Sequence, residues 1–163
     1  MSAHETVDVV VLSGGTGGHV IPAEILNTFF VNQGLKTIFI TDQRGERYLQ
    51  DQTRQGACVI PVMTGSFLRR LWGVFKSSCL LMRHMRNLQP KVIIGFGGYP
   101  SAGGGVAAFL LRIPLFVHEQ NAVLGRVNRL LGWIAKGVFL TFPDTRNVSS
   151  YVHKKALPII TFG

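Results

Sequence analysis

The sequence predicts an α/β domain built on a doubly wound parallel sheet. Short runs of β-branched and aromatic residues alternate with longer segments of helical period, and no linker or low-complexity segment interrupts this order. The chain has 163 residues, of which 47% are hydrophobic and 15% charged, and it contains 19 glycines. This length and composition fit one globular domain with tight turns.

Six segments are expected to be strands, and five longer segments between them are expected to be helices. The expected strands cover residues 7–12, 37–41, 58–62, 91–96, 114–118 and 137–141. The expected helices cover residues 22–34, 44–55, 67–88, 101–111 and 124–135. The first helix should have Pro22 near its first turn and Gly34 at its end, which is the usual asymmetry of helix termini.

Three loops that follow expected strands have an unusual composition. They are SGGTGGH (13–19), GFGGYPS (95–101) and HEQNAVLGRVN (118–128). In doubly wound sheets ligands bind at the carboxyl ends of the strands, where such loops gather. Glycines allow a positive φ and close approach of the backbone to a ligand, and the following helix offers unpaired N–H groups. The two glycine loops therefore predict neighbouring phosphate cradles, suited to a diphosphate or to two phosphorylated ligands.

Polar side chains near these loops are candidates for chemistry. His19 closes the first glycine loop, where a helix N-terminus lowers the histidine pKa and favours a neutral imidazole that can accept a proton from a hydroxyl group. His118, Glu119, Gln120 and Asn121 place an imidazole, a carboxylate and two amides after the fifth strand. Such a cluster either binds sugar hydroxyls or caps the next helix.

A nicotinamide-type nucleotide-binding module is an alternative function. Its glycine fingerprint, placed on Gly15 and Gly17, requires a third glycine where this chain has Val20, although Asp42 lies where a ribose-binding acid would be. A Walker phosphate loop is excluded, because no Lys-Ser or Lys-Thr follows the glycines. The two cysteines, Cys58 and Cys79, have no metal-ligand spacing. No metal and no cofactor are expected.

The charge of the chain is strongly basic and locally concentrated. Seventeen Lys and Arg residues against eight Asp and Glu give a net charge of +9, and no acidic residue occurs between Asp51 and Glu119. The expected helix 67–88 carries basic residues beside an apolar stripe, as helices at anionic membrane surfaces do. Its expected membrane-facing residues are Leu68, Arg69, Trp72, Phe75, Lys76 and Arg83.

Two other interpretations of this helix stay open. An apolar stripe also fits a helix that packs on a sheet, and Gly73 could break the helix into two parts. Basic residues beside aromatic ones could engage nucleic acid, but no recognition motif supports that partner. No apolar run is long enough to span a bilayer, and the polar, acidic N-terminus lacks the pattern of a secretion signal. We expect a peripheral protein at the cytoplasmic face of the cell membrane.

Three segments together resemble the N-terminal half of the MurG family of N-acetylglucosaminyltransferases. They are GGTGGHVIPA (14–23), GFGGYPS (95–101) and HEQNAVLGRVNRLL (118–131), in the family's order and spacing across nearly the whole chain. The resemblance implies a metal-independent GT-B enzyme, in which two Rossmann-like domains face each other across a cleft. Residues 1–163 would form the N-terminal, acceptor-binding domain, with the C-terminal donor-binding domain outside this chain.

The resemblance also implies a reaction in peptidoglycan synthesis. GlcNAc passes from UDP-GlcNAc to the 4-hydroxyl of MurNAc in undecaprenyl-diphospho-MurNAc-pentapeptide, which converts lipid I into lipid II with inversion at the anomeric carbon. The implied partners are these two substrates, an anionic membrane surface and other proteins of cell-wall synthesis. The chain alone should have little or no activity, and a non-catalytic domain that binds lipid-linked diphosphates is a further alternative.

Site residues follow from the resemblance by matching position. His19 and Glu119 would be catalytic. Contacts to UDP-GlcNAc are implied for Thr16, Gly17, Gly18 and Asn121. Contacts to the acceptor are implied for Gly14, Gly15, Gly97, Gly98, Tyr99, Ser101 and Asn128.

Overall fold

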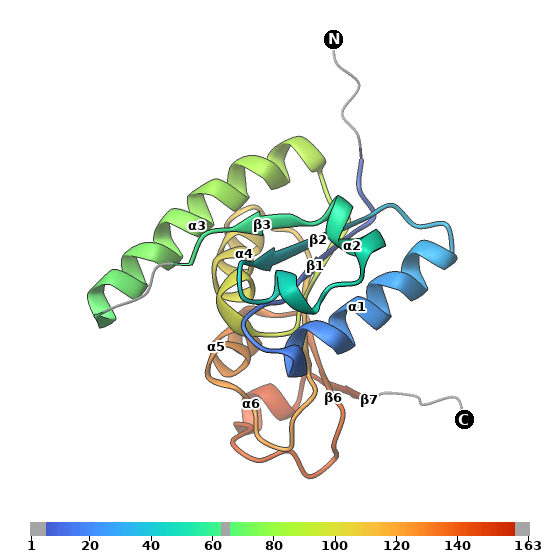
Figure 1. Ribbon diagram of the computed structural model, residues 1–163. Helices are drawn as coiled ribbons and strands as arrows, with labels where there is room; N and C mark the ends of the chain where they lie inside the picture. The colour runs from blue at the N-terminus through green and yellow to red at the C-terminus, as the bar shows by residue number, and fades with distance from the viewer. Residues whose placement is uncertain (1–5, 63–65, 159–163) are drawn as a thin grey trace.

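The chain folds around one parallel sheet of seven strands (Figure 1), in the order β3-β2-β1-β4-β5-β6-β7. The computed structural model describes residues 6–62 and 66–158, so the first residues of the polar N-terminal segment and the closing ITFG lie outside the described part. The strands are β1 (Val9–Leu12), β2 (Thr37–Asp42), β3 (Cys58–Ile60), β4 (Val92–Gly95), β5 (Leu115–Glu119), β6 (Gly137–Leu140) and β7 (Ala156–Pro158).

Helices cover both faces of this sheet. They are α1 (Gly17–Asn32), η1 (Glu46–Tyr48, a 3-10 turn), α2 (Asp51–Gly56), α3 (Phe67–Leu88), α4 (Gly98–Leu110), α5 (Arg126–Ile134) and α6 (Ser150–His153). Alternate residues of β1 point into two separate cores. Val10 and Leu12 pack with residues of α3, α4 and α5, whereas Val9 and Val11 pack with residues of α1. A parallel sheet with helices on both faces confirms the predicted Rossmann-like α/β fold.

The first helix begins earlier than its sequence pattern predicted. α1 starts at Gly17, so Pro22 lies in its second turn and not near the first. Because proline has no N–H group, it leaves the carbonyl of Gly18 without its helical partner. α4 likewise begins at Gly98, three residues before the predicted start.

The predicted helix 44–55 was wrong, because this segment is split into η1 and α2. The side chain of Asp42 accepts hydrogen bonds from the N–H groups of Arg44 (3.1 Å) and Gly45 (2.8 Å), and these bonds fix a turn where the helix was expected to begin. The short α6 and β7 were not predicted, and β7 extends the sheet by pairing with β6.

Candidate functional site

The two glycine loops meet in backbone contact at the carboxyl edge of the sheet. β1 and β4 are neighbours, with Leu12 aligned to Gly95, so their following loops emerge side by side. A Cβ atom at Gly98 would collide with the carbonyl oxygen of Gly14. Gly97 and Gly98 have φ values of 102° and 80°, a backbone conformation that residues other than glycine rarely adopt. The predicted convergence of the two loops is confirmed.

The side chain of Ser101 joins the second glycine loop to strand β1. Its Oγ accepts a hydrogen bond from the Gly97 N–H at 3.0 Å and lies 2.9 Å from the carbonyl oxygen of Leu12 in β1. The Ser101 side chain is fully buried. The expectation that it contacts the acceptor is therefore corrected, since its hydroxyl is used to join the loop to the sheet.

The first turn of α1 presents unpaired backbone donors. Thr16 is the N-cap residue, but its side chain makes no capping bond, because Oγ1 lies 3.0 Å from Nδ1 of His19. Among the described residues, the N–H groups of Gly17 and Gly18 have no hydrogen-bond partner. These donors lie at the positive end of the helix dipole, where an anionic group binds favourably.

The imidazole of His19 crosses from the first loop to the second. Its Nε2 atom lies 3.0 Å from the point that a Cβ on Gly97 would occupy. Burial lowers the pKa of His19 below its ordinary value, and the negative charge of Glu119 partly opposes this shift. The ring is therefore neutral near pH 7. In the tautomer whose Nδ1–H donates to Oγ1 of Thr16, Nε2 is free to accept a proton.

Glu119 is the anchor of the third loop. Its Oε1 accepts bonds from the backbone and side-chain nitrogens of Asn121, at 3.0 and 2.9 Å. Its Oε2 accepts bonds from the N–H of Gly125 and from Nδ2 of Asn128, at 2.8 and 2.9 Å. The carboxylate is completely buried. This geometry gives Glu119 a positioning role in place of the predicted catalytic one.

Asn128, in the first turn of α5, lies against the second glycine loop. Asn128 is almost fully buried and also donates to the carbonyl of His118 at 3.0 Å. Its Oδ1 has no hydrogen-bond partner within the described chain and lies 3.5 Å from the Cβ position of Gly97. The ring of His118 stacks on Phe96 with centroids 4.7 Å apart, and burial lowers the pKa of His118. Asn121, by contrast, is exposed at the surface of this edge.

Asp42 holds the first glycine loop against the loop after β2. Its Oδ1 accepts from the N–H of Gly15 at 3.1 Å, in addition to those of Arg44 and Gly45, and its Oδ2 pairs with the Arg44 guanidinium at 3.1 Å. Because this buried carboxylate is already bonded on both oxygens, it is not free to bind a ribose. Sequence reasoning missed this anchoring role, although an aspartate three residues before a glycine is a turn signal.

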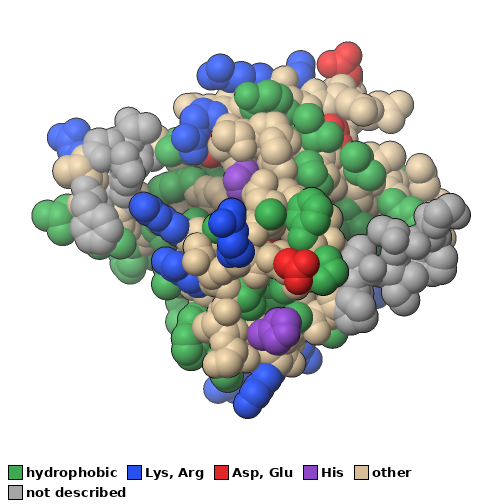
Figure 2. Space-filling view, turned by 90° about the horizontal axis from the view of Figure 1, so that it is seen from below, with side chains coloured by type: hydrophobic (Ala, Val, Ile, Leu, Met, Phe, Trp, Pro, Cys, Tyr) green, Lys and Arg blue, Asp and Glu red, His purple; other side chains and the backbone are tan. Residues whose placement is uncertain are grey.

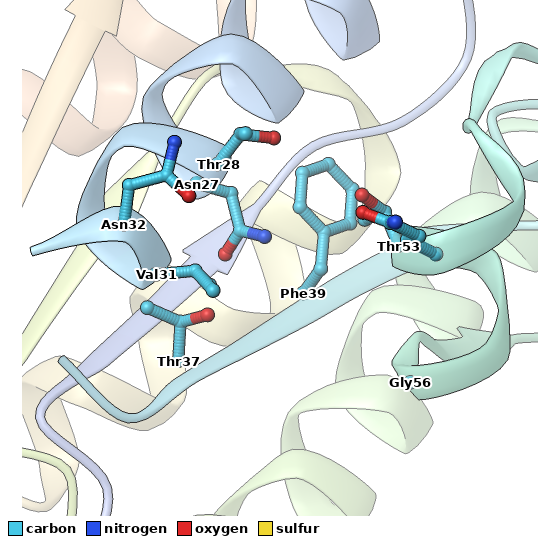
Figure 3. A pocket seen from close by; sticks show the side chains of 9 residues that line it. Asn27, Thr28, Val31, Asn32, Thr37, Phe39, Thr53 and Gly56 are labelled. Carbon is cyan, nitrogen blue, oxygen red and sulfur yellow. The ribbon is translucent and has the colours of Figure 1, made fainter. Parts of the chain in front are cut away.

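A pocket of about 220 Å³ lies away from the glycine loops (Figure 3). Asn27, Thr28 and Val31 of α1 face Thr37 and Phe39 of β2 across it. Thr37 begins β2, whereas the glycine loops gather at the other end of the strand, roughly 17 Å along it. This pocket is therefore separate from the site formed by the glycine loops.

Helix α3 turns its apolar stripe outward. The expected membrane-facing residues are all exposed, with Leu68, Phe75 and Trp72 at 75%, 58% and 53%. Buried Leu81 and Met85 lie on the opposite side of the helix and pack into the core. The stripe is thus not the core-packing face. The helix is continuous from Phe67 to Leu88, so the interpretation in which Gly73 breaks it is wrong.

The surroundings of this stripe are basic. Trp72 and Phe75 stack with centroids 5.4 Å apart, and the Lys76 ammonium lies 5.7 Å from the Trp72 ring centroid. Lys and Arg side chains outnumber acidic ones on the face seen in Figure 2. Among the described helices, none is both long and apolar enough to cross a membrane.

Comparison with known proteins assigns the chain to a family. Residues 9–140 match the glycosyltransferase family 28 N-terminal domain. The chain belongs to this family. Within glycosyltransferase family 28, it is 35% identical over 151 residues to the UDP-N-acetylglucosamine--N-acetylmuramyl-(pentapeptide) pyrophosphoryl-undecaprenol N-acetylglucosamine transferase of Rickettsia typhi, covering 90% of this chain and 38% of that protein. The transferase of the same name from Rickettsia canadensis is 32% identical, covering 95% of this chain and 44% of that protein.

Solved structures agree with this assignment. The crystal structure of Acinetobacter baumannii MurG matches with a TM-score of 0.76 and 31% identity, covering 93% of this chain and 45% of that one. The UDP-GlcNAc 2-epimerase of Methanocaldococcus jannaschii matches with a TM-score of 0.67 at 13% identity, a likeness of fold alone. The family 28 chain described here therefore spans less than half the length of these transferases.

Proposed function

We propose that this chain is the acceptor-binding part of a transferase that adds GlcNAc from UDP-GlcNAc to lipid I, forming lipid II. The observation that carries this proposal is the contact between the two glycine loops, with His19 lying over Gly97. The free N–H groups of Gly17 and Gly18 are donors at a helix N-terminus, next to the loop with the two positive-φ glycines Gly97 and Gly98, and such donors suit a diphosphate. The names of the relatives support this choice of substrates.

In the proposed reaction, His19 is the general base. The 4-hydroxyl oxygen of the acceptor MurNAc attacks the anomeric carbon of GlcNAc, the bond from that carbon to the UDP oxygen breaks, and the hydroxyl proton passes to Nε2 of His19. Thr16 holds the ring by its bond to Nδ1. Glu119 would not contact the substrate. It has a positioning role, because it holds Asn121 and Asn128 at the edge where a sugar would lie. Asn121 would bond a GlcNAc hydroxyl, and Tyr99 would border the acceptor.

We also propose that α3 holds the protein at the cytoplasmic face of an anionic membrane. Its outward aromatic and aliphatic residues would enter the interface, while Arg69, Lys76 and Arg83 would contact anionic headgroups. A basic residue near such a surface contributes about 1 kcal/mol. Both substrate presentation and membrane contact would then occur on the side of the molecule from which α3 projects (Figure 1).

The test is a binding measurement with a water-soluble lipid I analogue that carries a short isoprenoid chain. Calorimetry should detect binding of the analogue by the 163-residue chain, and a radiolabelled GlcNAc assay should detect little or no turnover by the chain alone. NAD⁺ serves as the control ligand. Binding of NAD⁺ without binding of the analogue would favour the nucleotide module and reject the proposal.

A further inference from the structure

A second cavity lies at the same edge of the sheet as the glycine loops. It has a volume of about 240 Å³ and is bounded by the end of β3, one side of α3 and the first turn of α4. Its walls are formed by Ile60, Pro61, Gly73, Lys76, Ser77, Leu80 and Tyr99. Ile60 is the last residue of β3, and because the sheet is parallel the cavity opens where β1 and β4 also end.

The lining of this cavity is apolar except at its rim. Ile60 is buried and Leu80 is 41% exposed, so the aliphatic surface runs from the core to the outside. The Ser77 hydroxyl does not provide a free polar group, because it donates to the carbonyl of Val74 at 2.9 Å. Lys76 is exposed and supplies a positive charge at the rim. Such a cavity fits a hydrocarbon chain that carries an anionic group at one end.

Tyr99 connects this cavity to the proposed diphosphate site. It follows Gly97 and Gly98 directly and belongs to the first turn of α4, so the wall of the cavity begins where the second glycine loop ends. A diphosphate bound at the glycine loops would therefore have an apolar cavity beside it, and the exposed Lys76 is one of the residues that line this cavity. The remaining length of a long chain could leave along α3, whose first turns project from the rest of the molecule (Figure 1).

We propose that this cavity binds the first isoprene units of the lipid-linked diphosphate, those nearest the phosphate groups. This inference rests on the proposed function, since it takes the glycine loops as the diphosphate site. The site then recognises the carrier lipid itself, in addition to its sugar and phosphate groups. Acceptors with a short isoprenoid chain would bind more tightly than acceptors with none.

The experiment compares farnesyl diphosphate, which has an isoprenoid chain and a diphosphate, with inorganic pyrophosphate, which has the diphosphate alone. Both are titrated calorimetrically into the 163-residue chain, with farnesyl diphosphate kept below its micellar concentration. Burying one methylene group strengthens binding about fourfold. Because several such groups would enter the cavity, we expect farnesyl diphosphate to bind at least ~30-fold more tightly than pyrophosphate.

Leu80→Asn places a polar amide in the cavity wall, and Leu68→Asn is its control on the same helix. Leu68 is 75% exposed and does not line the cavity. We expect Leu80→Asn to lose most of the farnesyl advantage while keeping pyrophosphate affinity, and Leu68→Asn to keep both. Far-UV circular dichroism and thermal unfolding of the whole chain verify that both variants fold.

The other outcomes separate this inference from the proposed function. Equal affinity for farnesyl diphosphate and pyrophosphate would overturn the cavity assignment and leave the diphosphate site standing. An equal loss of farnesyl diphosphate affinity in both variants would place the isoprenoid chain on the exposed stripe of α3. That result would also overturn the cavity assignment. Binding of neither ligand would reject the diphosphate site and the cavity assignment together.

Discussion

A Cβ atom at Gly97 would come within 2.7 Å of Cδ2 of His19, so the imidazole lies in the space that any other residue at position 97 would need. The side chain of His19, the candidate base, is thus packed closely against the second glycine loop. Each also belongs to a different βα unit, because His19 lies in α1 and Gly97 caps α4. The site depends on the packing of both units.

Gly97→Ala should therefore weaken binding of the lipid I analogue at least ~10-fold, because the methyl group displaces His19 and strains a φ of 102°. Gly34→Ala is the matched control. Gly34 has a φ of 78°, but a Cβ there would meet nothing within 4 Å. Both variants should lose ~1–3 kcal/mol of unfolding free energy, yet only Gly97→Ala should lose affinity. Equal affinities in calorimetry would argue against the fitted contact.

His19 should titrate below the ordinary histidine value of 6.5, because burial lowers its pKa. The unfolded chain then binds a proton that the folded chain does not between the lowered pKa and 6.5. This contribution to stability is fully present above pH 6.5 and is lost as pH falls from 6.5 to the folded pKa. NMR titration of the ring proton, with the denatured chain as reference, measures the shift. A midpoint at or above the denatured value contradicts the burial argument.

Glu119→Gln should destabilise the third loop by ~2–3 kcal/mol, because four donors lose a charged acceptor and two of them must face an amide NH₂ group. Asp144→Asn, at an exposed position, should change stability by less than ~0.5 kcal/mol. Chemical denaturation compares the two. If Glu119→Gln is as stable as Asp144→Asn, the positioning role of Glu119 is wrong.

Membrane attachment should depend on the cations of α3. The triple variant Arg69→Gln, Lys76→Gln and Arg83→Gln should bind anionic vesicles at least ~10-fold more weakly at low salt, because each cation contributes about 1 kcal/mol. The control variant replaces three exposed lysines outside α3 with glutamine, namely Lys36, Lys136 and Lys154. Co-sedimentation with anionic and neutral vesicles gives the comparison. A similar loss in the control would show that net charge alone, and not α3, attracts the membrane.

The sequence predicted the parts of the site that depend on local composition and strand order. Parallel strands end at one edge, so two glycine loops after β1 and β4 had to emerge there, and their composition marked them as backbone cradles. The extent of α3 also followed directly from its helical period, and its bounds agree with the predicted 67–88. These features require no knowledge of which side chains are buried.

The parts that sequence did not predict depend on contacts between distant residues. The family resemblance implied a catalytic role for Glu119, but the use of its carboxylate is set by donors as far along the chain as Asn128. Asp42 likewise lies where the alternative nucleotide module would have its ribose-binding acid, and its bond to Gly15 joins residues 27 positions apart. In α3, the stripe of large apolar residues was a plausible core face until the smaller Ser77 and Ser78 proved to be buried in its place.

The most direct test of the account follows backbone amide resonances while the lipid I analogue is added to the chain. We expect the resonances of Gly17 and Gly18 in the first loop and of Gly97 and Gly98 in the second to shift together, with one common affinity. Thr28 and Thr53, which line the separate pocket of Figure 3, should stay unchanged. Shifts confined to Thr28 and Thr53, or to only one of the two glycine loops, would contradict a shared diphosphate site.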